Sequence, residues 1–377
     1  TYRNALTGRY GLVRLTTRFR DVQLPDIQVV DVKEMRRKRL MSGPFSPQLI
    51  DLMRDALEHR RQVILFQNRR GFSPIVECHV CGWTPRCEKC DVSLTYHQRL
   101  RQMVCHYCGT PYQVPLQCPN CESKEIRHVG YGTERIEDQL AKVLPEARIA
   151  RMELDTTRSR MAYEQILQDF QQGKTDVLVG TQMVTKGHDF GNVTLVGVLS
   201  ADLSLYVDHY RAAERTFNLL TQVVGRAGRG AKTGRAVIQT YTPENDVIQA
   251  AAAQDYERFY DAEITLRRLR RDPPFADQFT VTVTGAEEAA VRRAAELLRQ
   301  GMDAAVKKAP YDALGLDIIG PAPAPVVKVN GIYRYRLLVL GQNTAPVREL
   351  LASFMRTFAQ RPENRRLHIY TDCDRMD

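Results

Sequence analysis

The sequence of 377 residues lacks several features that would assign it to a common class. No apolar run approaches the roughly 18 residues of a membrane-spanning helix, so we expect no membrane partner. The chain opens on Thr1, with neither an initiator methionine nor an apolar signal segment, and we expect an excised piece of a longer protein. It also contains neither a G-x4-G-K-S/T phosphate loop nor a D-E-x-H sequence. The sequence therefore supplies no complete site of its own for a nucleoside triphosphate.

One short segment, Gly173-Lys174-Thr175, looks like the end of a phosphate loop. That motif requires a second glycine five positions earlier, and Gln168 stands there. A phosphate loop also follows a strand and opens a helix, whereas here a helix is expected to end and a strand to begin. Gly173 is therefore predicted to cap the C-terminal end of a helix.

Positive charge is in excess, with a formal net charge of +10 and a pI of about 9.2. Such a balance creates a field that attracts polyanions, including nucleic acids. Clusters of basic residues occur at 35–40, 68–70 and 266–271. Each cluster is either part of a nucleic-acid surface or simply a solvated face.

Eight of the nine cysteines form C-x2-C pairs, which are Cys78 with Cys81, Cys87 with Cys90, Cys105 with Cys108, and Cys118 with Cys121. Two such pairs supply the four thiolates of a tetrahedral Zn²⁺ site, so the sequence predicts two structural zinc ions. A disulfide framework would suit a small secreted domain better than this long chain. Cys373 stands alone and is predicted to be a spare thiol.

Two groupings of the four pairs are open. A nested grouping places Cys78, Cys81, Cys118 and Cys121 on zinc 1 and Cys87, Cys90, Cys105 and Cys108 on zinc 2. A sequential grouping joins the first two pairs and the last two. We favour nesting because it encloses a hairpin-like segment and brings the two ends of the insert together. The nearby aromatic residues either stack on bases or pack around the metals; they are Trp83, Tyr96, His97, Tyr107 and Tyr112.

Strand and helix patterns alternate on both sides of this insert. Buried strands are expected at 26–32, 62–68, 147–154, 176–181, 193–201 and 234–241, with helices at 46–60, 134–144, 159–172 and 210–224. This alternation predicts an α/β fold with a parallel sheet and helices on both faces. Binding groups are then expected beyond the carboxyl ends of the strands.

The segment after DPPFADQ (272–278) is expected to form a small α+β sandwich domain. In YRYRLLVL (333–340), Arg334 and Arg336 share one strand face, and Tyr333 and Tyr335 share the other. The strand is either turned toward DNA or simply half-buried.

The stretch QVVGRAGRG (222–230) places Arg226 and Arg229 among three glycines. Small residues beside paired guanidinium groups indicate a planar anion held close to the backbone. The alternative is that both arginines cap the end of a helix.

The order of these motifs resembles the PriA family of bacterial primosomal replication-restart helicases, which belong to superfamily two. The segments that carry the resemblance are VILFQNRRGFS (63–73), followed by the cysteine insert, GYGTERIEDQL (130–140), DVLVGTQMVTKGHDF (176–190), QVVGRAGRG, GPAPAPV (320–326) and YRYRLLVL. The family's N-terminal DNA-binding domains and first RecA-like lobe have no counterpart here.

The resemblance implies four segments: the exit from the first lobe (1–20), a second RecA-like lobe (21–77 and 123–265), a zinc-binding insert (78–122) and a C-terminal α+β domain (266–377). It implies that Arg226 and Arg229 reach the γ-phosphate of ATP bound by the missing lobe. Arg229 would be the arginine finger, exposed in this chain. Gln222 would couple nucleotide to DNA.

Further roles follow from the same resemblance. Gly187 and Asp189 fall where relatives contact the nucleotide, although Asp189 could instead cap a loop. Thr181, Asn68, Arg69 and Arg70 fall where relatives contact a DNA strand.

The implied function is that of an ATP-dependent 3′-to-5′ DNA helicase in replication restart, with Mg²⁺ and ATP as cofactors of the whole protein. The implied partners are forked and single-stranded DNA, the tail of single-stranded DNA-binding protein, and other primosome and helicase-loading proteins. We expect a monomer in the bacterial cytoplasm, associated with the nucleoid, and no ATP hydrolysis by this chain alone. The alternative is a zinc-bearing scaffold that binds forks without a motor; an RNA helicase lobe is disfavoured by the layout of the insert.

Overall fold

The chain folds into two compact units. The computed structural model describes residues 2–14, 23–67, 75–78, 80–81, 83–97, 101–129, 133–152, 160–185, 190–207, 209–228 and 233–374. The first unit comprises Thr1–Ser73 and Gly130–Glu263, and the second comprises Pro74–Val129 and Ile264–Asp377. The cysteine insert thus belongs to the same unit as the C-terminal domain.

The first unit is built on a six-stranded sheet in which every strand pair is parallel. The strand order is β1-β11-β10-β2-β9-β8. The strands are β1 (Asp26–Asp31), β2 (Gln62–Phe66), β8 (Ile149–Met152), β9 (Val177–Gly180), β10 (Val193–Val198) and β11 (Arg235–Thr240). Each lies within a range predicted from the sequence, because continuous apolar runs are typical of strands buried on both faces.

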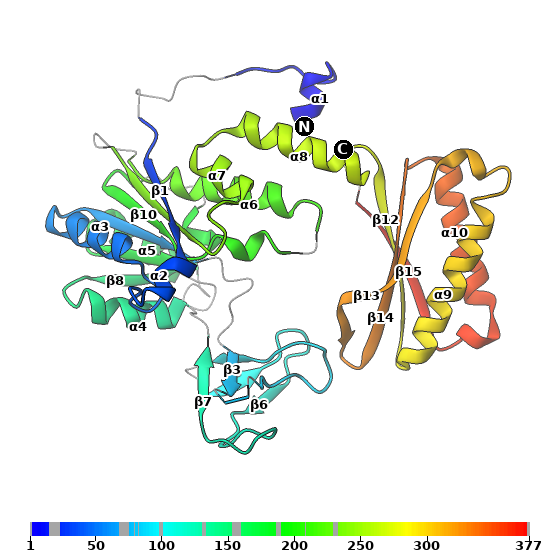
Figure 1. Cartoon of the computed structure of the whole chain (residues 1–377), viewed down its shortest axis with the longest axis horizontal. Coiled ribbons are helices and arrows are strands. Elements are labelled where there is room, and N and C mark those ends of the chain that lie inside the picture. Colours follow the sequence, from blue (N-terminus) through cyan, green and yellow to red (C-terminus); the bar gives the residue numbers. More distant parts are fainter. Residues whose placement is uncertain are drawn as a thin grey trace. The chain divides into compact units, whose positions relative to one another are not determined.

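Helices cover both faces of this sheet (Figure 1). Alternate side chains of a strand point to opposite faces, so Ile64 and Phe66 enter one apolar core while Val63 and Leu65 enter the other. The helices over the first core are α5 (Arg160–Gln171), α6 (Ala212–Val224), α7 (Asp246–Ala252) and α8 (Tyr256–Arg270). Those over the second core are α3 (Pro47–Glu58) and α4 (Thr133–Val143). Two shorter helices, α1 (Tyr2–Leu6) and α2 (Val32–Arg37), complete the unit.

The second unit contains the C-terminal domain, a four-stranded antiparallel sheet with the order β13-β14-β12-β15. Its strands are β12 (Asp277–Gly285), β13 (Asp317–Val329), β14 (Ile332–Gly341) and β15 (His368–Asp374). Helices α9 (Glu288–Ala305) and α10 (Ala345–Gln360) share one apolar core with the sheet. The expected α+β class is therefore present.

The insert carries two small antiparallel sheets. Strands β3 (Ile75–Cys78) and β7 (Ile126–Val129) pair where the chain enters and leaves the insert. Strands β4 (Thr95–His97), β5 (Gln102–Val104) and β6 (Pro111–Gln113) form a three-stranded sheet between them. In the part of the chain that the structure describes, no helix has the length and apolar content needed to cross a bilayer.

The turn that follows α6 lies tightly against the sheet. The N–H of Gly228, whose φ is +71°, donates a hydrogen bond to the carbonyl of Val193 at a distance of 3.0 Å. Gly234 lies on the other side of the same turn. A Cβ atom on Gly234 would lie 2.4 Å from the carbonyl carbon of Ala227 and 2.5 Å from the nitrogen of Gly228. Only glycine therefore fits at position 234 without moving the turn.

We predict that Gly234→Ala displaces this turn and destabilises the first unit by roughly 1–3 kcal/mol, since the clash is with backbone. Gly191→Ala is the matched control, because nothing lies within 4 Å of its added Cβ. The unfolding midpoint in a thermal or denaturant melt measures both changes. Equal midpoints for the two variants would contradict the tight packing of this turn.

Candidate functional site

The four cysteine knuckles of the insert share one backbone geometry. In each, the N–H of the first cysteine donates a hydrogen bond to the carbonyl five residues later, at 2.8–3.0 Å. The four bonds run from Cys78 to Trp83, Cys87 to Val92, Cys105 to Thr110, and Cys118 to Ser123. The residue before the acceptor has a left-handed backbone at Gly109 (φ +73°) and Glu122 (φ +57°). These tight turns point both sulfur atoms of a knuckle toward the same side.

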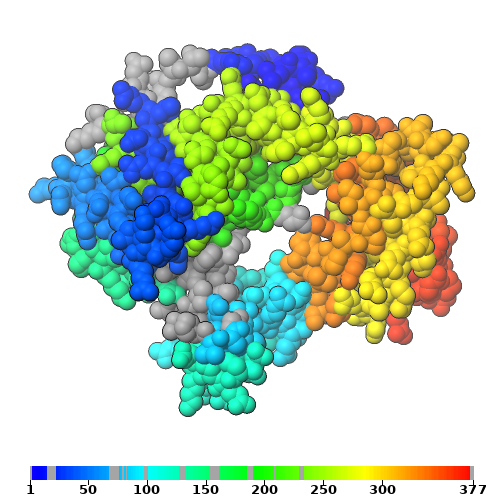
Figure 2. All heavy atoms as spheres, viewed as in Figure 1, coloured from blue at the N-terminus to red at the C-terminus, as the bar shows by residue number. Residues whose placement is uncertain are grey.

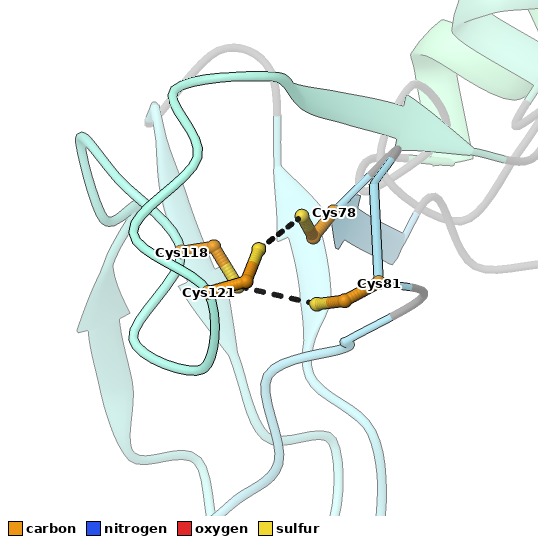
Figure 3. Close-up of side chains that lie close together, drawn as sticks. All are labelled: Cys78, Cys81, Cys118 and Cys121. Atoms are coloured by element: carbon orange, nitrogen blue, oxygen red, sulfur yellow. Dashed lines mark hydrogen bonds between the residues drawn. The ribbon is translucent and has the colours of Figure 1, made fainter.

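The knuckles assemble into two four-cysteine clusters in the nested arrangement that the sequence favours. Cys78, Cys81, Cys118 and Cys121 form one cluster, and Cys87, Cys90, Cys105 and Cys108 form the other, with all sulfur atoms of each within 4.8 Å of one another. Figure 3 shows the first cluster, in which Sγ of Cys78 lies 3.6 Å from that of Cys121. In the second cluster Sγ of Cys87 lies 3.7 Å from that of Cys108.

These separations fit a tetrahedral zinc ion. A Zn–S distance of about 2.3 Å places the corners of the tetrahedron roughly 3.8 Å apart, close to the spacings found here. A disulfide would instead hold two sulfur atoms at about 2.05 Å. The clusters therefore suit structural Zn²⁺, and four thiolates leave no coordination position open for water or substrate.

Polar neighbours contact the sulfur atoms of the first cluster. The side-chain amide of Asn120 lies 3.5 Å from Sγ of Cys81, and the backbone N–H of Asn120 donates to Sγ of Cys118 at 3.4 Å. The Asn120 amide lowers the pKa of Cys81 to about 6. A hydrogen bond to the thiolate favours its charged form, which is the form that binds zinc.

The second cluster is buried more deeply. Burial raises the pKa of Cys105 to about 12, whereas the hydroxyl of Thr110 lowers the pKa of Cys108 to about 6. The hydroxyl of Tyr112 lies 3.3 Å from Sγ of Cys87 and accepts a hydrogen bond from the N–H of Glu88. A divalent cation replaces the thiol protons, which allows all four sulfur atoms of this cluster to be thiolates together.

The aromatic residues of the insert divide between the two roles left open by the sequence. Tyr112 and Tyr96 pack against the small apolar core around the second cluster. The side chain of Tyr107 is 56% exposed and remains available for stacking. Packing around the metal is therefore the role of Tyr112, and its hydroxyl explains why a tyrosine stands there.

Arg226, a predicted nucleotide contact, and Thr181, a predicted DNA contact, lie at opposite edges of the sheet. Gly228 bonds to Val193, the first residue of β10, so the turn that carries Arg226 lies at the amino-terminal edge of the sheet. Arg226 therefore lies at the edge opposite to the carboxyl ends of the strands, where binding groups were expected, because α6 runs back antiparallel to the strands. Thr181 directly follows Gly180, the last residue of β9, and so lies at the carboxyl edge.

At the amino-terminal edge, Gln222 is exposed on the last turn of α6 and Arg226 is half-buried just beyond the capping residue Gly225. Several other predicted contacts lie outside the described residues; they are Arg229, Gly187, Asp189, Asn68, Arg69 and Arg70.

The prediction that Gly173 ends a helix is confirmed. The N–H of Gly173 bonds to the carbonyl of Phe170, and that of Lys174 bonds to the carbonyl of Asp169. With φ of +71° at Gly173, this is a left-handed C-terminal cap and not a phosphate-binding loop.

The strand YRYRLLVL turns its two faces to different surroundings. Tyr335 is 8% exposed in the core, and its hydroxyl donates to a carboxylate oxygen of Glu288 at 3.0 Å. Arg334 on the opposite face is half-buried and donates two hydrogen bonds to the carbonyl of Val326. The tyrosine face is therefore structural, and the half-buried reading holds for this strand.

Sequence reasoning missed the residues that support the cysteines. Thr110 and Asn120 each lie two residues from a cysteine and contact its sulfur, Thr110 through its hydroxyl and Asn120 through its backbone N–H. A polar residue two positions after a cysteine can therefore indicate, from the sequence alone, a hydrogen bond to that sulfur. Tyr112 lies 25 positions from Cys87, and no local pattern indicates the contact between them.

We predict that Cys105→Ser and Cys118→Ser each reduce the zinc content from about two ions per chain to about one, because each removes a ligand from a different cluster. Cys373→Ser, which lies outside both clusters, is the control and should keep about two. Zinc binding of about 10–16 kcal/mol per site accounts for most of the folding energy of such small modules. Zinc measured by elemental analysis well below two ions in the unmodified chain would overturn the two-site assignment.

Comparison with known proteins identifies three domain families along the chain. Residues 268–376 match the C-terminal domain of primosomal protein N, residues 87–110 match the Cys-rich region of PriA DNA helicase, and residues 123–231 match the helicase conserved C-terminal domain. The Cys-rich match contains the four cysteines of the second cluster. The helicase match contains Thr181, Gln222 and Arg226.

Relatives that align with almost all of this chain agree with these domain matches. The replication restart protein PriA of Bacillus subtilis (strain 168) is 40% identical over 376 residues, which are 99% of this chain and 46% of the relative. That of Haemophilus influenzae is 35% identical over 374 residues, which are 99% of this chain and 50% of the relative. Among solved structures, RecG bound to a three-way DNA junction covers 66% of this chain and 23% of its own, with 10% identity and a TM-score of 0.36.

The chain spans about half the length of the curated relatives that it matches. Its three domain matches and its agreement with these relatives along nearly all of its residues lead to one conclusion: the chain belongs to the PriA family of replication restart proteins.

Proposed function

We propose that this chain is part of an ATP-dependent DNA helicase that moves 3′ to 5′ and acts in replication restart. The observation that carries the proposal is the coincidence, on one chain, of the helicase match at 123–231 with a two-cluster cysteine insert at the position typical of this family. The chain would supply the second RecA-like lobe, the insert and the C-terminal domain. The lobe that grips the phosphates and Mg²⁺ would lie elsewhere in the whole protein.

In the whole protein, the turn that carries Arg226 would complete the nucleotide site from the side opposite the lobe that grips the phosphates. Arg226 lies at the amino-terminal edge of the sheet, held there by the packing of Gly228 and Gly234. A guanidinium is suited to this role because its planar fork matches the equatorial oxygens of a phosphoryl group during transfer. We infer that Arg229 is the finger itself, that Gln222 links nucleotide to DNA, and that Gly187 and Asp189 contact the nucleotide.

The opposite edge of the sheet would bind the DNA strand. Thr181 lies there after β9, and the segment after β2 contains Asn68, Arg69 and Arg70. Because β9 and β2 are neighbours in the sheet, their carboxyl ends lie side by side. The net charge of +10 favours a polyanion at such a surface. If nucleotide and DNA bind at opposite edges of the sheet, closure of the two lobes on ATP would move the residues that contact the DNA strand.

By relation to the family, the partners would be forked and single-stranded DNA, the tail of single-stranded DNA-binding protein, and other primosome and helicase-loading proteins. The protein would act as a monomer at the nucleoid in the bacterial cytoplasm. These partners are proposed by analogy with the related replication restart proteins.

A second candidate is a fork-binding scaffold without a motor. The sequence holds no G-x4-G-K-S/T loop and no D-E-x-H segment, and both candidates accommodate this, because the phosphate-binding lobe of a motor would lie elsewhere in the whole protein. The two candidates differ in whether the whole protein hydrolyses ATP.

We predict that this chain alone does not hydrolyse ATP, because it lacks the phosphate-binding lobe. In the whole protein, Arg229→Ala should lower the DNA-stimulated ATPase rate by about 10³-fold or more, with DNA affinity changed by less than about twofold. Arg54→Ala, an exposed arginine on α3 of the same lobe, is the matched control and should retain activity. A phosphate-release assay and a DNA-binding titration measure the two properties.

Two outcomes would contradict these assignments. An unchanged ATPase rate in Arg229→Ala removes the finger assignment, and DNA-stimulated hydrolysis by the isolated chain shows that the nucleotide site is complete within it. A whole protein without any ATPase activity would favour the scaffold.

We also predict that the chain prefers forked DNA to duplex DNA and RNA, and that binding weakens steeply with salt as counterions are released. Binding titrations of the three nucleic acids at two salt concentrations test this. A steep salt dependence with equal affinity for all three would reduce the chain to a general polyanion binder.

A further inference from the structure

A tight turn at the end of the β13–β14 hairpin lies against the second cysteine cluster. Val329 pairs with Ile332 across this turn, which leaves Asn330 and Gly331 as its two central residues. Their φ angles are +50° and +80°, so both adopt a left-handed backbone. An Asn-Gly pair with this conformation is the favoured two-residue turn of a hairpin. The turn is therefore a preformed, rigid element.

The backbone of the turn bonds directly to the knuckle that contains Cys87 and Cys90. The N–H of Asp91 donates to the carbonyl of Lys328 at 2.9 Å, and the N–H of Gly331 donates to the carbonyl of Lys89 at 2.7 Å. Between these two bonds, the N–H of Asn330 donates to Sγ of Cys90 at 3.1 Å. The ligand sulfur thus accepts a hydrogen bond from a residue 240 positions away in the sequence.

Side chains reinforce the contact. Val329 packs against the small apolar core that includes Cys87, Cys90 and Cys105. The ammonium group of Lys328 donates to the carbonyl of Glu88 at 3.1 Å and lies 5.5 Å from the centre of the Tyr333 ring. Figure 2 shows the insert and the hairpin in contact within this unit. The turn thus meets the knuckle through backbone, apolar and charged groups at once.

The negative charge of the cluster explains how these contacts stabilise it. Four thiolates around Zn²⁺ leave a net charge of −2, and Cys90 is fully buried. Water cannot solvate that charge at a buried sulfur, so N–H donors and nearby cations must stabilise it. Asn330 supplies such a donor, and Lys328 places a positive charge against the same knuckle.

We propose that the β13–β14 turn is an outer part of the second zinc site, and that zinc binding and docking of the C-terminal domain stabilise each other. Groups that hydrogen-bond to metal ligands typically contribute 10- to 100-fold to metal affinity. By thermodynamic linkage, whatever the turn adds to zinc binding, zinc adds to docking of the turn. The metal would then hold the insert and the C-terminal domain in one unit. This inference does not depend on helicase activity.

The test uses Zn²⁺ itself as the probe, with the whole chain and a colorimetric chelator. Val329→Asp places a carboxylate beside the anionic cluster and should release one of the two zinc ions about 10-fold faster or more, while the other is unaffected. Ile319→Asp is the matched control, because Ile319 is 53% exposed on the same strand and lies outside the cluster core. Release at the rate of the unmodified chain for both ions in Val329→Asp would overturn the proposal.

Two gentler variants keep the test valid if Val329→Asp misfolds. Lys328→Met removes only the ammonium contact and should speed release of the same ion by a smaller factor. Asn330→Gly retains the N–H and tolerates the left-handed backbone, so zinc release should match that of the unmodified chain. Release from Lys328→Met equal to that of the unmodified chain would contradict the proposed role of the charge. Faster release from Asn330→Gly would show that the asparagine side chain, and not the backbone donor, supports the site.

The effect of zinc on docking of the β13–β14 turn is tested by a separate measurement. Cys105→Ser, which removes a ligand of the second cluster, should increase amide hydrogen exchange at residues 328–331 while leaving β12 and β15 protected. Cys118→Ser, which affects the first cluster, is the control and should leave exchange in the turn unchanged. Equal protection of the turn in both variants would show that docking is independent of the second zinc ion.

Discussion

A parallel sheet must be buried on both faces, and the rest of the first unit follows from that constraint. Helices α3, α4, α5 and α6 each lead into the next strand of the sheet and return the chain to the starting edge. Loops consequently gather at two opposite edges, which have different partners in the proposed function. Thr181 lies at the carboxyl edge and Arg226 at the amino edge, separated by the full length of a strand. A single rigid sheet can therefore link two ligands without a contact between them.

The insert is organised by a different interaction, the bond between metal and thiolate. Few apolar side chains are buried around the second cluster, and Cys87, Cys90 and Cys105 are themselves part of that core. Metal coordination takes the place that apolar burial has in the sheet, since a segment of this size buries too little surface to fold alone. The insert leaves the lobe after β2 and returns before α4, and the pairing of β3 with β7 closes its base.

Prediction from the sequence succeeded where the determining interactions are local. The C-x2-C spacing indicated zinc because two residues between cysteines bring both sulfur atoms to one ion. The helix predicted at 46–60 corresponds to α3, whose N-cap Ser46 accepts at its hydroxyl a hydrogen bond from the N–H of Leu49. Gly173 indicated the end of α5 for an equally local reason. The motif order indicated the family. The sequence left open which cysteines share a metal, because that depends on how strands pair.

The sequence by itself determined the strands and helices of the lobe, the chemistry of the insert and the family, since these depend on spacing along the chain. Only the tertiary structure decided the edge at which Arg226 lies, because that depends on the direction in which α6 returns across the sheet. The contact between Asn330 and Cys90 was likewise beyond any local pattern, although Asn-Gly marks the turn itself. A hydrogen bond across 240 residues is determined by how two folded segments pack, and no window of sequence contains both partners.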